Sequence, residues 1–525
     1  MRTHTGPYRY RNTAALLVLA LLAIFVHTRW LGRMPLTEDE ETSADVATGM
    51  GFRYETPQYA HVVLPPAKKI FTPADLWQRN NVRSVTTYTI ADNGNNYAYN
   101  LLLHYWIELA GFSVFRIRLL SAVCIIFTTL LLFRLGQKIN GSFMAGLFAA
   151  ALFALHPVVI IYGHIARSYA LSMLLVTLSM GLVCLLVKSD LPVRRRRWLY
   201  MVFVIVSVSM VMSHYFNAVI VCYNLAALFI TARRRHTVLP VVITAIGVLL
   251  PVMAWLLVSG TGFGLVQNFQ AHVDAQAGQL AWLPEAKPLP TAMGLLAMLA
   301  SAFGNATLPG MGLKMWINIA LLLLPAVLIV YALKRSGTSR RSLAWYMTGA
   351  VGSFVLFALL VAVVSGHLFI CQFRFWVFII PYAVLLPAFA LQKEIWAGKS
   401  AFLPKAAVLL IMLRAVFTGV TFVSDRTVAF SGGHITIDAS GPGYHGEPYE
   451  TAATAVKEKY RQGYTVLYNN PRVAQNINWF LRGHPQIQQS IDTQVMHRIT
   501  VLRADGTPVW TFDDLDVHEN IDGAN

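Results

Sequence analysis

Four consecutive acids, Glu38, Asp39, Glu40 and Glu41, follow the first hydrophobic segment of the chain. Acids are scarce afterwards. Between positions 96 and 423 the chain carries only Glu108, Asp190, Asp274, Glu285 and Glu394. A carboxylate beside a membrane can act as a general base that takes a proton from a reacting hydroxyl. Because so few side chains can play this part, Asp39 and Glu40 are the leading candidates.

The composition is that of a polytopic membrane protein. Of the 525 residues, 56% are hydrophobic and only 13% are charged, which is more apolar than one soluble core requires. The net charge of +17 comes from short basic clusters between apolar segments, such as 194–197 and 233–235. Such clusters are typical of cytoplasmic loops. A nucleic-acid-binding face would gather the basic residues on one domain, so we expect no nucleic-acid partner.

Apolar segments of about 20 residues predict about eleven transmembrane helices in an α-helical polytopic fold. The expected spans are 13–30, 115–135, 142–162, 167–187, 198–213, 214–232, 238–258, 313–333, 343–365, 370–391 and 401–422. Two shorter stretches, Tyr97–Gly111 and Pro290–Phe303, are expected to be juxtamembrane helices, because two further spans would place basic loops outside. The N-terminus is then cytoplasmic, the first span is uncleaved, and the C-terminus lies outside.

The acidic motif and the apolar segments that would position it are predicted to belong to one large domain. Residues 1–423 are predicted as the membrane domain, and its first outer loop, residues 31–114, carries the acidic motif. Residues 424–525 are predicted as a small soluble α/β domain. Its expected helices lie near 449–462 and 472–481, and its expected strands at 465–468 and 497–502. The four cysteines lie in or beside apolar segments, so no disulfide framework is expected. The expected absence of disulfides and the uncleaved first span fit a bacterial inner membrane with a periplasmic outer side.

Three segments stand out by their order, spacing and sidedness: TEDEETSADVA, DNGNNYAYNLLLHYWIELAGFSVFRIRLLSA and HPVVIIYGHIARSYAL. Together they resemble the GT-C membrane glycosyltransferases. The resemblance is closest to glycosyltransferase family 39, the protein mannosyltransferases and lipid A aminoarabinose transferases, and it covers about the first 240 residues. Many of these relatives carry a Pro-Pro pair where this chain reads Asn95-Asn96-Tyr97-Ala98-Tyr99.

The resemblance implies transfer of a sugar from a polyprenyl-phosphate donor to an acceptor on the periplasmic side. Asp39 matches the first acid of the family's DE motif and is expected to be the general base. Glu40 matches the second acid and is expected to position groups around it. The alternative is that both acids only solvate a loop beside the lipid. The acceptor stays open among a protein, a lipid and a glycan.

Further candidates for substrate binding follow from the same resemblance. Asp92 matches an acidic position that can hold sugar hydroxyls, or it only forms an Asp-Asn-Gly turn. Arg118 matches an arginine that would pair with the Asp39 loop or with phosphate, and its alternative is snorkelling to the headgroups. Arg167, with Tyr169 and His164 close by in sequence, would face the lipid phosphate or the sugar, or it is an interface anchor.

Later positions complete the set. His214 and Tyr215 match a His-Tyr pair near the sugar site, with a hydrogen-bonded structural histidine as the alternative. Arg374 resembles the family's late arginine near the carrier phosphate. Lys68 and Lys69 are further candidates for phosphate contact, or they are attracted to anionic headgroups.

A metal cofactor is not required by this chemistry. No HxxH, HExxH or cysteine pair occurs on the outer side. Asp39, Glu40 and Asp92 could share one divalent cation through oxygen ligands, but arginines suffice to stabilise a leaving phosphate. A transporter or flippase of lipid-linked sugars is the alternative function. It predicts internal repeats and helices broken at the bilayer midplane, whereas the polar residues here collect at the outer interface.

Overall fold

The computed structural model describes the helical part of the chain and five short strands. The described residues are 6–32, 36, 38–48, 82–91, 94–187, 191–259, 288–303, 313–365, 370, 373–392, 402–424, 465–468, 489–490, 498–502, 508–513 and 516–518. The chain divides into two compact units. The first comprises Met1–Arg29, Thr89–Asn100 and Arg118–Pro442. The second comprises Trp30–Tyr88, Leu101–Ile117 and Gly443–Asn525.

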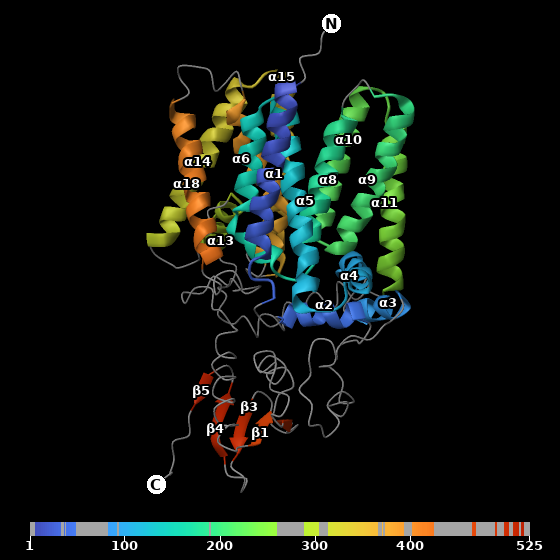
Figure 1. The fold of residues 1–525 in the computed structure, drawn as a ribbon. Coiled ribbons are helices and arrows are strands. Elements are labelled where there is room, and N and C mark those ends of the chain that lie inside the picture. Colours follow the sequence, from blue (N-terminus) through green and yellow to red (C-terminus); the bar gives the residue numbers. More distant parts are fainter. Residues whose placement is uncertain are drawn as a thin grey trace. The chain divides into compact units, whose positions relative to one another are not determined.

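Six helices within the described residues are long and apolar enough to cross a membrane (Figure 1). They are α1 (Gly6–Thr28), α5 (Val114–Asn140), α8 (Tyr169–Leu186), α9 (Val193–Ser213), α11 (Leu239–Val258) and α15 (Thr338–Ser365). Each coincides with an expected span, so the prediction of a multi-pass helical membrane protein is confirmed. The number eleven is not confirmed. Three further expected spans correspond to helices outside these six, α10 (Asn217–Arg234), α14 (Leu313–Arg335) and α18 (Phe402–Ser424).

The expected span 142–162 is bent in its middle. It consists of α6 (Phe143–Ala154) and α7 (Pro157–Gly163), whose axes differ by 58°. The break has a local cause, because His156 is extended and Pro157 lacks the N–H that would continue the helical hydrogen bonds. Counted as one crossing, this pair raises the number of candidate spans among the described residues to seven.

The expected span 370–391 is not confirmed, because its described helical part, Val377–Leu391, is shorter than a membrane span. The structure has three short 3₁₀ turns, η3 (Phe373–Phe375), η4 (Val377–Ile379) and η5 (Phe389–Leu391), around the nine-residue helix α16 (Ile380–Ala388). Pro381 and Pro387 each remove a backbone donor from this segment. Every residue from Val377 to Leu391 is buried. A fully buried segment of this kind belongs to the interior of the helical bundle.

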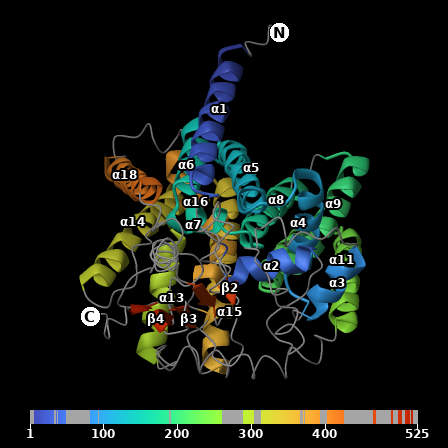
Figure 2. The same cartoon turned by 60° about the horizontal axis from the view of Figure 1, so that its bottom comes forward.

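Some neighbouring helices approach one another closely through small residues. Both ribbon views show α9 beside α11 and α14 beside α18 (Figures 1 and 2). Between α5 and α6, a Cβ on Gly136 would lie only 2.8 Å from the Cα of Gly146. Because the two backbones approach this closely, only glycine fits at both positions.

One polar cluster joins four elements inside the first unit. The hydroxyl of Tyr346 on α15 donates to Oδ1 of Asn224 on α10 at 2.6 Å, and the hydroxyl of Tyr382 on α16 donates to the same oxygen at 3.2 Å. The Asn224 amide in turn donates to the Ser179 hydroxyl on α8 at 2.8 Å. Asn224, Ser179 and Tyr382 are fully buried. In an apolar surrounding such interhelical bonds fix which helices pair.

The second unit contains helices where the sequence predicts an outer loop, and the C-terminal strands. The acidic segment is helix α2 (Glu38–Thr48). The helices α3 (Val82–Ala91) and α4 (Tyr97–Ala110) contain residues of both units. α4 and α13 (Pro288–Ala302) coincide with the two shorter helices expected from the sequence, and their juxtamembrane position stays a prediction.

A five-stranded sheet is formed in the order β2-β1-β3-β4-β5 (Figure 1). Its strands are β1 (Thr465–Tyr468), β2 (Gln489–Ser490), β3 (Arg498–Leu502), β4 (Pro508–Asp513) and β5 (Asp516–His518). β1 is parallel to β2 and antiparallel to β3, with Val466 opposite Val501 in the latter pair. The strands expected at 465–468 and 497–502 are thus present, whereas the two expected helices lie outside the described residues.

Candidate functional site

The acidic motif lies in the first turn of a helix. Helix α2 begins at Glu38, so Asp39 and Glu40 lie where the helix dipole stabilises negative charge. Successive residues of a helix point about 100° apart. Accordingly the two acids differ in environment, because Glu40 is fully buried whereas Asp39 is partly exposed. The roles expected for the two acids stay predictions.

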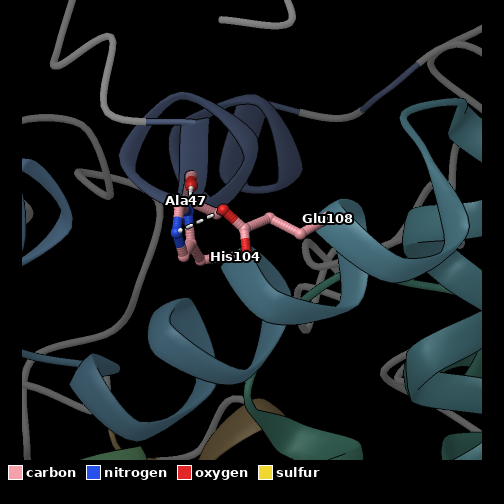
Figure 3. Close-up of polar contacts among 3 residues, drawn as sticks. All are labelled: Ala47, His104 and Glu108. Atoms are coloured by element: carbon pink, nitrogen blue, oxygen red, sulfur yellow. Dashed lines mark hydrogen bonds and ion pairs between the residues drawn. The ribbon is translucent and has the colours of Figure 1, made fainter. Parts of the chain in front are cut away.

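The other end of α2 is attached to α4 by a histidine (Figure 3). The His104 ring nitrogen Nδ1 lies 2.9 Å from the carbonyl oxygen of Ala47, and Nε2 lies 3.5 Å from Oε1 of Glu108. A carbonyl can only accept, so Nδ1 is the donor. Ala47 belongs to the last turn of α2, where carbonyl groups have no partner within the helix. His104 was not among the predicted site residues.

A second group of candidate residues lies in the first unit, around His214. This histidine occupies the turn between α9 and α10 and is buried. Its ring centroid lies 6.1 Å from that of Tyr169 and 4.8 Å from that of Phe378. The backbone N–H of Phe216 donates to Nδ1 at 3.3 Å, which leaves Nε2 as the protonated nitrogen of the neutral ring.

The positive charges of two arginines disfavour protonation of this imidazole. Burial lowers the pKa of His214 to about 3, and the positive charges of Arg374 and Arg167 contribute to the lowering, in that order. His214 is therefore neutral at physiological pH, and its neighbours supply the positive charge. Arg374 lies in η3 with its guanidinium 4.9 Å from the centroid of the Phe375 ring. The structure thus brings together four predicted residues, Arg167, Tyr169, His214 and Arg374.

Arg167 is positioned by its own short turn. It lies between α7 and α8, and its backbone N–H donates to the Ile165 carbonyl at 2.9 Å. The next residue, Ser168, donates its hydroxyl proton to Oδ1 of Asn96. Asn96 has a positive φ of 61° and caps α4, because its carbonyl accepts the N–H of Asn100 at 2.9 Å. Asparagine is one of the few residues that adopt this left-handed conformation readily.

Residues from other elements of the same unit also contact the Asn96 turn. Trp255 on α11 donates its indole proton to the Gly94 carbonyl at 3.0 Å, and its ring stacks on Tyr97 at 4.3 Å. A Cβ on Gly94, where φ is 68°, would lie 2.7 Å from the hydroxyl oxygen of Tyr215. The predicted residue Tyr215 therefore packs against this turn. Residues 94–96 thus form a turn that side chains from other elements hold in place.

Arg118 is buried, unlike an arginine that anchors a helix at the membrane surface. Its side chain is fully buried near the start of α5. A snorkelling arginine would extend its guanidinium to the membrane surface, so the burial disfavours that alternative. Arg118 belongs to the first unit, whereas Asp39 and Glu40 belong to the second.

Three predicted residues, Asp92, Lys68 and Lys69, lie outside the described residues. Sequence reasoning did not select Asn96, Ser168 or Trp255, because their importance depends on contacts between distant parts of the chain. Within the described ranges no group of three or more His, Cys, Asp or Glu side chains could hold a metal ion. The shared-cation alternative required Asp92 and is therefore not tested.

Comparison with known proteins yields structural similarity only. No protein-family model and no curated protein sequence matches the chain. Among solved structures, ArnT from Cupriavidus metallidurans bound to undecaprenyl phosphate is 12% identical, covers 90% of this chain and 85% of its own, and gives a TM-score of 0.49. The archaeal oligosaccharyltransferase AglB from Archaeoglobus fulgidus, in complex with an inhibitory peptide and a dolichol-phosphate, is 13% identical with a TM-score of 0.42.

The AglB alignment covers 92% of this chain, which spans 61% of AglB. The arabinofuranosyltransferase AftD from Mycobacteria is 14% identical over 86% of this chain and 30% of its own, with a TM-score of 0.39. Because all three TM-scores lie below 0.5, the functional assignment below rests on this chain's own residues.

Proposed function

We propose that the protein is a membrane glycosyltransferase that moves a sugar from a polyprenyl-phosphate donor to an acceptor on the periplasmic side of a bacterial inner membrane. The observation that carries the proposal is the grouping of Arg167 and Arg374 around the buried, neutral His214. Two guanidinium groups and a ring N–H together offer the donors that an anionic phosphate and its attached sugar require.

In the proposed reaction, Asp39 takes the proton from an acceptor hydroxyl, and the hydroxyl oxygen attacks the anomeric carbon of the sugar. The bond between that carbon and the phosphate oxygen breaks, and polyprenyl phosphate leaves. Arg167 and Arg374 stabilise the negative charge that develops on the leaving phosphate. Glu40, which is buried beside Asp39 in the chain, holds the first turn of α2 in place.

Deletion of the gene tests this function in cells. Loss of a transferase leaves its donor unused, so we expect the polyprenyl-phosphate sugar to accumulate in lipid extracts, and the wild-type gene to reverse this. Asp39→Asn should fail to reverse it, because the amide cannot take a proton. Glu41→Gln, which removes one acid from the same helix, is the matched control and should restore the wild-type lipid profile.

Full reversal by Asp39→Asn would remove Asp39 as the base. The same experiment distinguishes a transporter or flippase, because loss of such a protein leaves the lipid-linked sugar on the cytoplasmic side of the membrane. Accumulation that is accessible only from the cytoplasmic face, and that Asp39→Asn relieves, would favour transport.

A further inference from the structure

Polar side chains pair in register where α8 packs against α10 and the turn before it. The pairs are Tyr169 with His214, Ser172 with Asn217, and Ser179 with Asn224, and the two members of each pair are 45 positions apart. The backbone N–H of Asn217 donates to the His214 carbonyl at 2.9 Å. The Ser172–Asn217 pair therefore lies directly beside the candidate site.

The side chain of Asn224 uses both ends of its amide. Nδ2 donates to Ser179 Oγ at 2.8 Å, and Oδ1 accepts the hydroxyl protons of Tyr346 and Tyr382 at 2.6 Å and 3.2 Å. Asn217 precedes Asn224 by seven residues, which is about two helical turns. The two asparagines consequently point in nearly the same direction from α10, and Asn217 is expected to need the same two kinds of partner.

The side chain of Asn217 uses only one end of its amide. Nδ2 donates to the carbonyl oxygen of Met210 at 2.8 Å and to Ser172 Oγ at 3.1 Å. Because a carbonyl can only accept, the Met210 contact fixes which end of the amide is the nitrogen. Among the described residues Oδ1 has no hydrogen-bond partner, although the side chain is fully buried. Most buried acceptors are paired, so this oxygen indicates a donor that does not belong to the chain.

The two elements whose tyrosines serve Asn224 present phenylalanines beside His214. Phe378 lies four positions before the tyrosine of α16, and Phe354 lies eight positions after the tyrosine of α15. The ring centroid of Phe378 lies 4.8 Å from that of His214 and 6.2 Å from that of Phe354. Phenylalanine carries no hydroxyl, so these side chains offer Asn217 no proton. A molecule bound beside His214 can supply it.

We propose that Oδ1 of Asn217 accepts a hydroxyl of the donor sugar, which makes Asn217 a specificity-determining residue. This inference rests on the proposed function, in which Arg167 and Arg374 hold the phosphate beside His214. Three residues correspond to about 5 Å along a helix, so the acceptor lies close enough to reach a sugar attached to that phosphate. A sugar that lacks this hydroxyl would leave the buried oxygen unpaired and bind less tightly.

Native mass spectrometry of the purified full-length protein tests this role with two lipids. One is the polyprenyl-phosphate sugar that accumulates in the gene-deletion strain, and the other is polyprenyl phosphate. Asn217→Ala should weaken binding of the first lipid roughly 5- to 150-fold, the range expected when a buried hydroxyl loses its acceptor. Binding of polyprenyl phosphate should stay within about twofold of wild type. Ser172→Ala is the matched control, because it removes the contact between the two side chains and keeps Oδ1, so both dissociation constants should match wild type.

Equal weakening of both lipids by Asn217→Ala would overturn the proposal, because a residue that only holds the turn affects them alike. If this variant does not fold, a cryo-EM structure of the wild type with the accumulated lipid decides the question. A sugar hydroxyl at hydrogen-bond distance from Oδ1 supports the role, and a water molecule or no donor there refutes it.

The same strain separates this inference from the proposed function. If no lipid-linked sugar accumulates, the glycosyltransferase fails and the role of Asn217 fails with it. If the lipid accumulates and Asn217→Ala binds it as tightly as wild type does, only the role of Asn217 fails.

Discussion

Replacing Arg374 by alanine is expected to weaken binding of a polyprenyl phosphate by roughly 10- to 150-fold. Arg374 is one of two arginines that act on His214, and it is partly buried at the head of the interrupted segment. A charge-assisted hydrogen bond in such a site contributes about 1.5–3 kcal/mol, and each 1.4 kcal/mol changes the dissociation constant tenfold. Arg374→Lys keeps the charge and loses the bidentate geometry. We expect it to lose about half of this free energy, which corresponds to roughly 3- to 12-fold weaker binding.

The assay is native mass spectrometry of the purified protein with a short-chain polyprenyl phosphate, and a neutral polyprenol serves as the ligand control. Phe375→Leu is the matched variant, because it removes the ring 4.9 Å from the Arg374 guanidinium and leaves the charge. A cation–π contact contributes about 0.5–1 kcal/mol at an exposed site and about 2 kcal/mol when it is desolvated. Phe375→Leu keeps the Arg374 charge that would contact the phosphate, so it should weaken binding less than Arg374→Ala does. Binding by Arg374→Ala within about twofold of wild type would show that Arg374 only anchors its segment.

Three further predictions concern neighbouring residues. Asn96→Ala should destabilise the protein by about 1–2 kcal/mol more than Asn96→Gly, because alanine is strained at a φ of 61° and glycine is not. Asn96→Gly should match Ser168→Ala in thermal denaturation, and equal effects of the alanine and glycine variants would contradict this. Asn224→Leu should lower the thermal midpoint more than Tyr346→Phe does, because it leaves Ser179 and both tyrosine hydroxyls without their shared partner; an unchanged midpoint would mean that the cluster adds no stability. Burial and the positive charges of the two arginines depress the pKa of His214 to about 3, so the ring gains a proton only in strong acid. Wild type and His214→Gln should therefore show parallel pH profiles of phosphate binding from about pH 5 to about pH 8. A wild-type inflection within that range that His214→Gln removes would refute a neutral ring.

Much of the fold was predictable because transmembrane helices leave a strong local signal. The spans around α5, α8 and α11 follow from uninterrupted apolar stretches alone. The segment 370–391 is equally apolar, yet its described helical part, Val377–Leu391, is shorter than a span and is completely buried among neighbouring helices. Hydropathy measures only how apolar a segment is, so it does not separate a buried segment from a lipid-facing helix.

The site was predictable in part. Arg167, Tyr169, His214 and Arg374 were selected by resemblance, and the structure groups them. The helical state of α2 was missed, because its short polar sequence has no apolar periodicity to reveal it. The role of Asn96 depends on Ser168, 72 positions away, and the role of His104 depends on Ala47, 57 positions away. Contacts of this range are not encoded in any local pattern.

The most direct test of the central claim is mass spectrometry of the lipids that co-purify with the protein from its native membrane, compared with Asp39→Asn. We expect a polyprenyl phosphate with the wild type and a polyprenyl-phosphate sugar enriched in Asp39→Asn, because the variant binds the donor and cannot activate the acceptor. Absence of any isoprenoid phosphate from both proteins would contradict a lipid-linked donor and, with it, the proposed glycosyltransferase.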